Sequence, residues 1–79
     1  MDNQQKLVNA FVQALGIQQD QVTDTLTYNT IKEWDSTAHM ILVAELEDTF
    51  DVMLDTDDII DMSSVGKAKT ILANYDIAF

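Results

Sequence analysis

Residues 33–50 read EWDSTAHMILVAELEDTF and hold the clearest helical pattern in the chain. Asp35 and Ser36 are both preferred at helix starts, and the apolar run begins directly after them. At 100° per residue, the side chains expected to face a core are those of His39, Leu42, Val43, Leu46 and Phe50. The stretch therefore predicts an amphipathic helix from Ser36 to about Asp51.

Three further segments carry helical periodicity, and no stretch alternates as a strand would. The first runs from about Asn3 to Leu15, with Gly16 placed to end it. A short helix is expected from about Thr56 to Met62, and a last one follows Ser63-Ser64, a natural cap pair. The buried stripe expected for this last helix is Val65, Ala68, Ile71, Leu72 and Tyr75, with Phe79 continuing it. The fold class we predict is all-α: a four-helix bundle with three long helices and a short third one.

A long connection separates Gly16 from Asp35, and loops of this length in small domains are often functional. Apolar residues recur along it and are expected to pack over the bundle: Ile17, Val22, Leu26, Tyr28 and Ile31. Trp34 is expected to act as a hydrophobic anchor just before the second helix.

Composition predicts one domain, residues 1–79, with 47% apolar residues. Fourteen acidic residues face four lysines, and a net charge of -10 disfavours nucleic acid while favouring basic protein partners. The longest apolar run has five residues and the start, MDNQQK, is polar, so we expect neither a membrane span nor a signal peptide. We therefore expect a cytoplasmic monomer.

Metal sites are also not expected. The chain has no cysteine and one histidine, which excludes a zinc site of the usual ligands. The acidic stretch from Asp55 fails as an EF-hand loop, because Ile59 and Ile60 occupy the fifth and sixth positions.

Ser36 has three interpretations. Read alone, the Asp-Ser pair is a helix cap. As a hydrolase nucleophile it would use His39, three residues on, but no glycine-rich turn offers an oxyanion hole. As a modified serine it would place a phosphate ester at a helix N-terminus, where backbone N–H groups and the helix dipole favour it. These considerations alone do not choose between a cap and a modified serine.

The sequence around Ser36 resembles the acyl carrier proteins, whose hallmark is Asp-Ser-Leu at the start of the second helix of a four-helix bundle. DSTAHMILVAELEDTFDV, residues 35–52, is similar to that second helix. LDTDDIIDM, residues 54–62, is similar to the family's short acidic third helix, and SSV at residues 63–65 to the start of its fourth. The resemblance covers essentially the whole chain.

This resemblance implies a carrier that performs no catalysis itself. Ser36 would bear 4′-phosphopantetheine, donated by coenzyme A through a magnesium-dependent phosphopantetheinyl transferase, and Asp35 would help that enzyme engage it. An acyl or aminoacyl group would travel as a thioester from a loading enzyme to a downstream transferase or synthase. The partners' basic patches would meet the second-helix surface, for which we name Thr37, Met40, Ile41, Glu45, Glu47 and Asp48.

The sequence departs from the family pattern at two of these positions. Thr37 replaces the usual leucine, and Ile41 stands where fatty-acid carriers commonly have an acidic residue, so that with Met40 and Ala44 it could form an apolar contact spot. Trp34 and His39 make the motif look more like that of carriers of specialised pathways than of housekeeping fatty-acid synthesis. For His39 the expected role is a partly buried, hydrogen-bonded residue.

Two alternatives stay open. One is a peptidyl or aminoacyl carrier of a nonribosomal-peptide-like pathway. The other is a non-catalytic acidic interaction module that has kept the fold without the cofactor.

Overall fold

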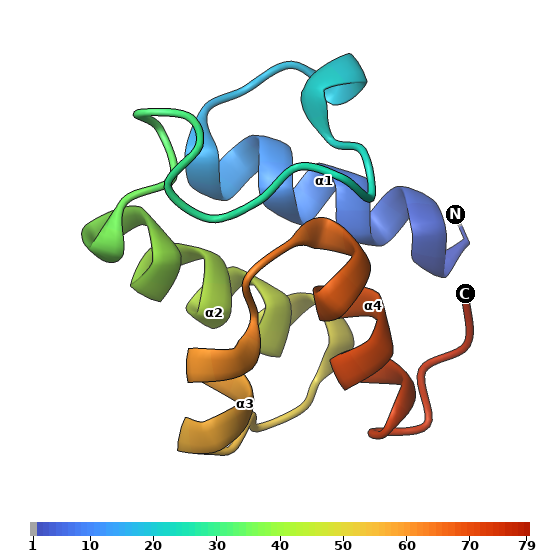
Figure 1. Ribbon diagram of the computed structural model, residues 1–79. Helices are drawn as coiled ribbons and strands as arrows, with labels where there is room; N and C mark the ends of the chain where they lie inside the picture. Colours follow the sequence, from blue (N-terminus) through green and yellow to red (C-terminus); the bar gives the residue numbers. More distant parts are fainter. Residues whose placement is uncertain (1) are drawn as a thin grey trace.

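The computed structural model describes residues 2–79, which form four α-helices, one short 3-10 helix and no strand (Figure 1). The elements in chain order are α1 (Asn3–Leu15), η1 (Gln19–Gln21), α2 (Ser36–Phe50), α3 (Thr56–Asp61) and α4 (Val65–Ala73). The all-α prediction is confirmed. The expected bounds of α1 are also those observed, and α2 and α3 end within a residue of expectation.

The ends of α1 and α2 follow from local chemistry. The Asp2 side chain accepts from the Gln5 N–H at the start of α1, and Gly16 ends it in the left-handed conformation. Asp51 takes the same conformation after α2, at a φ of 55°, and the Val52 N–H then reaches back to the Glu47 carbonyl oxygen. This six-residue closure stops the helix and turns the chain toward α3.

The fourth helix is shorter than expected: it stops at Ala73, before the predicted stripe of buried residues is complete. Asp76 has a φ of 66°, and the Ile77 N–H bonds back to the Leu72 carbonyl oxygen. The chain therefore reverses, and Tyr75 and Phe79 lie beyond the helix rather than on it. Phe79 still packs, since its ring meets that of Phe50 edge-on at 6.0 Å.

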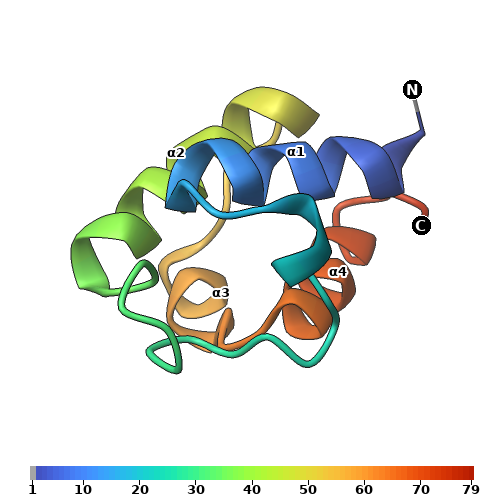
Figure 2. The ribbon, with the colours of Figure 1, turned by 90° about the horizontal axis from the view of Figure 1, so that it is seen from above.

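One core runs between α1, α2, α4 and the connecting loop. Its fully or nearly buried apolar residues include Leu7, Phe11, Trp34, Leu42, Leu46, Met62, Val65 and Leu72. α1 and α2 make the most extensive helix contact, and the start of α1 lies beside the C-terminal residues, where the Asn3 side chain donates to the Ala78 carbonyl oxygen at 2.9 Å (Figures 1 and 2).

The long loop is packed, as expected, although its anchors are not equally buried. Ile17 and Val22 are buried and Leu26 and Ile31 are partly buried, whereas Tyr28 is exposed at the surface. Sequence periodicity did not reveal the single turn of 3-10 helix, η1, because three residues carry no repeat.

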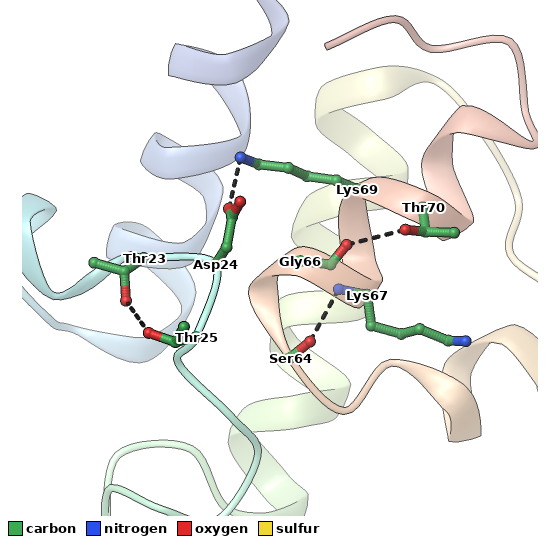
Figure 3. A network of polar contacts seen from close by, with 8 residues as sticks. All are labelled: Thr23, Asp24, Thr25, Ser64, Gly66, Lys67, Lys69 and Thr70. Carbon is green, nitrogen blue, oxygen red and sulfur yellow. Dashed lines mark hydrogen bonds and ion pairs between the residues drawn. The ribbon is translucent and has the colours of Figure 1, made fainter.

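Backbone pairing and an ion pair attach the loop to α4, and Figure 3 shows the ion pair between Asp24 and Lys69. The N–H groups of Val65 and Gly66, which have no acceptor within the helix, donate to the carbonyl oxygens of Leu26 and Asp24. The Asp24 carboxylate also pairs with Lys69 at 2.7 Å. A Cβ on residue 66 would lie 3.2 Å from the Asp24 carbonyl oxygen, so glycine permits this close approach.

Candidate functional site

Ser36 is the first residue of α2, and Asp35 is the residue that caps the helix. The Asp35 carboxylate accepts from the Ala38 N–H at 2.9 Å. Ser36 is exposed, and its hydroxyl has no hydrogen-bond partner among residues 2–79. The capping task therefore does not occupy this hydroxyl, which is presented to solvent at one end of the helix.

A cavity of about 360 Å³ lies beside Ser36. One side is formed by α2 and the other by α3 and the residues that follow it. The lining residues are Tyr28, Ser36, His39, Met40, Ile59, Ile60, Met62 and Ser63. No Asp, Glu, Lys or Arg is among them, so the lining is mainly apolar, and its polar side chains are the His39 imidazole and three hydroxyls.

His39 forms part of the cavity wall and makes two hydrogen bonds. Its Nδ1 accepts from the Trp34 indole N–H at 3.0 Å, because an indole nitrogen only donates. Its Nε2 lies 2.8 Å from the Ile59 carbonyl oxygen, which only accepts. Together the two partners assign the neutral tautomer with the proton on Nε2.

These bonds confirm that His39 is a partly buried, hydrogen-bonded residue. They also bear on the hydrolase interpretation. Both ring nitrogens are engaged by Trp34 and Ile59, so in this arrangement the imidazole has no lone pair to offer the Ser36 hydroxyl.

The bond to Ile59 has a clear structural reason. A helix leaves its last carbonyl groups without partners. The N–H that would continue α3 to the Ile59 oxygen belongs to Ser63, and it bonds to Asp61 instead, at 2.7 Å. His39 therefore caps the end of α3 from α2.

Trp34 holds the imidazole in place. It is fully buried, as an anchor residue should be. Its ring meets those of Phe11 and Tyr28 edge-on, at 5.5 Å and 6.1 Å between centroids. Tyr28 also meets the His39 ring edge-on, at 5.3 Å, and through Tyr28 the loop contributes to the cavity lining.

The residues named for a partner surface lie along α2, and most of them face solvent. Thr37 and Asp48 are exposed, and Met40 and Ile41 are 58% and 52% exposed. Glu45 is half-buried. An apolar spot and acidic side chains therefore share the exposed face of α2.

Glu47 differs from the others because its carboxylate is used inside the domain. It accepts from the Leu54 N–H at 2.9 Å, across the turn that follows α2. Leu54 is buried, so this bond satisfies a backbone group with little access to water. Glu47 thus has a structural task that the sequence did not indicate.

The first turn of α3 is held by Tyr75. Its hydroxyl donates to the Asp58 carboxylate at 2.5 Å and accepts from the Asp55 N–H at 3.1 Å. The hydrogen bond to Asp58 raises the pKa of Tyr75 above its ordinary value. α3 is therefore bonded at its start to the turn that follows α4 and at its end to α2.

Sequence reasoning found Asp35, Ser36 and Met40 but missed the other side of the cavity. Tyr28, Ile59, Ile60 and Ser63 reach it only through the course of the loop and of α3. The one usable signal was Trp34 five residues before His39, a buried donor that needs an acceptor.

No family model, curated protein or solved structure matches this chain. Within residues 2–79, no cluster of three or more His, Cys, Asp or Glu side chains could hold a metal ion. In the same range no helix is both long and apolar enough to cross a bilayer.

Proposed function

We propose that this chain is a stand-alone acyl carrier protein with the acyl-carrier type of four-helix bundle. Ser36 would carry 4′-phosphopantetheine, and the arm would deliver a thioester-bound group between enzymes of a biosynthetic pathway. The observation that carries the proposal is an exposed, unpaired Ser36 hydroxyl at the start of α2, directly beside an apolar cavity.

The residues around Ser36 suit this group. A phosphodiester on the hydroxyl would lie near the N–H groups of Ser36 and Thr37. These are the first two residues of α2, so their N–H groups have no acceptor within the helix. When bound, the arm supplies a thiol that holds the cargo. The chain's own contribution is to present the attachment point and to make delivery nearly intramolecular once a partner has docked.

The cavity favours one class of cargo. Its lining holds no charged side chain, and His39 is neutral there with both nitrogens occupied. The ammonium of an aminoacyl cargo, or the free carboxylate of a dicarboxylic acyl cargo, would lose its hydration in this cavity without gaining a partner of opposite charge. An uncharged acyl group is therefore the better fit, which favours an acyl over an aminoacyl carrier.

Intact mass spectrometry tests the proposal. The purified protein is incubated with coenzyme A, magnesium and a broad-specificity phosphopantetheinyl transferase. We expect the mass gain of one phosphopantetheine, lost in Ser36→Ala and kept in Ser63→Ala, which removes the other serine hydroxyl at the cavity. Absence of modification with several transferases would leave the acidic interaction module, whose partner would bind equally well to Ser36→Ala.

A further inference from the structure

We propose that His39 is a positioning residue that latches α3 to the start of α2, and that this latch sets the width of the cavity beside Ser36. The biological meaning of the latch rests on the proposed carrier function, since the cavity then receives cargo from the Ser36 arm. The latch itself is a property of the unmodified chain.

The first argument is that α3 has little internal stability. It has six residues, and helices of this length do not persist on their own. None of its side chains is fully buried, and Ile60, which lines the cavity, is 73% exposed. Segments with so few buried contacts open at low free-energy cost. Leu54 and Met62 anchor the chain in the core on either side of α3, and between these anchors the position of the helix depends on its hydrogen bonds.

The second argument is where those bonds lie. Tyr75 ties the first turn of α3 to the turn that follows α4, and neither Tyr75 nor Asp58 lines the cavity. At the other end, the His39–Ile59 bond is the one hydrogen bond between α2 and α3 within residues 2–79. Ile59 and Ile60 belong to this end and line the cavity. Met62 and Ser63, which also line the cavity, are held by burial and by the Tyr28 N–H, so release of the His39 bond would free the part of the wall that Ile59 and Ile60 supply.

The third argument is that the latch is pre-organised. Trp34 fixes the imidazole through Nδ1, and its own indole is locked in the core against Phe11. The Nε2–H is consequently directed at the Ile59 carbonyl oxygen by contacts that do not involve α3. Breaking this bond leaves the Trp34 contacts intact, so Ile59 and Ile60 can shift while Met62, the buried residue that follows α3, stays in the core.

Two substitutions separate the latch from the core contact. His39→Asn keeps a polar atom near the position of Nδ1 for the indole N–H, but its side chain is too short to reach the Ile59 carbonyl. His39→Leu loses both bonds. Ile71→Val, a small change at a buried α4 position away from the cavity lining, controls for a general loss of stability.

Amide hydrogen exchange on the unmodified proteins is the first measurement. We expect the amides of Ile59, Ile60 and Asp61 to exchange roughly tenfold faster in His39→Asn than in wild type, as the loss of one hydrogen bond implies. The amides of α1 should change much less. Ile71→Val should instead leave the ratio of α3 to α1 exchange as in wild type. Unchanged α3 exchange in a folded His39 variant would overturn the proposal.

The second measurement uses protein whose Ser36 carries an octanoyl or an acetyl phosphopantetheine arm, transferred from octanoyl or acetyl coenzyme A by the phosphopantetheinyl transferase. We expect hydroxylamine to cleave the octanoyl thioester faster in His39→Asn than in wild type, because a loosened cavity shields it less. The acetyl thioester should be cleaved at equal rates in both. Equal octanoyl rates would refute the link between latch and cavity, whereas failure of all variants to load would refute the carrier function and leave the exchange result standing.

Discussion

Replacing Trp34 by Phe removes one buried indole N–H and leaves the aromatic character of the site. The His39 Nδ1 then loses its donor, and leaving a buried polar atom unpaired costs about 1–3 kcal/mol. Trp34 is 0% exposed, so the smaller ring also leaves a void, which costs about 24 cal/mol per Å³. Together these losses predict that Trp34→Phe lowers the free energy of unfolding by about 2–4 kcal/mol.

Urea unfolding followed by far-ultraviolet circular dichroism measures this loss. Fluorescence is unsuitable because Trp34 is the chain's one tryptophan. A cycle of Trp34→Phe, His39→Leu and the double variant isolates the bond, since partners in one hydrogen bond are coupled by about 0.5–3 kcal/mol. The second substitution should therefore cost less once the first is present.

Additive costs would refute the reasoning. They would mean that the indole and imidazole do not act as a pair, and that the loss in Trp34→Phe reflects the void alone. A loss below about 1 kcal/mol would contradict the burial and bonding together.

Three further predictions concern single contacts. Glu47→Ala should lower the free energy of unfolding by about 1–2 kcal/mol, because the Leu54 N–H loses its acceptor. Asp48→Ala, at an exposed position, should change it by no more than about 0.5 kcal/mol. Equal effects of the two substitutions in urea unfolding would contradict the role given to Glu47. The raised pKa of Tyr75 means that its hydroxyl stabilises the fold fully below about pH 10 and that this contribution is lost as the pH rises through the raised value. The stability difference between wild type and Tyr75→Phe, measured by urea unfolding from pH 8 upward, should therefore shrink above about pH 10, and a difference independent of pH would count against it. Lys69→Gln should cost under about 1 kcal/mol and less in high salt, because Asp24 is largely exposed; a larger, salt-independent loss in the same assay would show that the pair is not solvent-screened.

Much of the fold follows from local sequence signals. The helix starts are set by the side chains of Asp2, Asp35 and Ser64, each of which accepts from the backbone N–H three residues on. Gly16 ends α1 as its conformational freedom allows. The end of α4 was not predictable in this way. It depends on left-handed Asp76, and a non-glycine residue gives little sequence warning of a positive φ.

The residues of the candidate site likewise fall into those that a local motif predicts and those that only tertiary packing brings together. Ser36 and its capping neighbour Asp35 are adjacent in sequence, so a local motif was enough to find them. The opposite wall of the cavity comes from residues more than twenty positions away, whose approach depends on where the loop and α3 pack. Glu47 shows the converse: helical periodicity placed it correctly on α2 but could not show that Leu54 would return to it.

The core helices and α3 are held in place by different interactions, and this determines which substitutions can reshape the cavity. The core is built by apolar residues of α1, α2, α4 and the connecting segments, including Leu54 and Met62 on either side of α3. α3 itself contributes no fully buried side chain, and hydrogen bonds to His39 and Tyr75 fix it between these two anchors. Because the net stability of a small domain is only about 5–15 kcal/mol, a cavity walled by core helices could not be widened without risk to the fold. A wall held by individual hydrogen bonds can be repositioned at a cost of about 1 kcal/mol each. Substitutions that change the size of this cavity, and with it the cargo preference of the proposed carrier, should therefore concentrate at α3 and at the residues bonded to it rather than in the core.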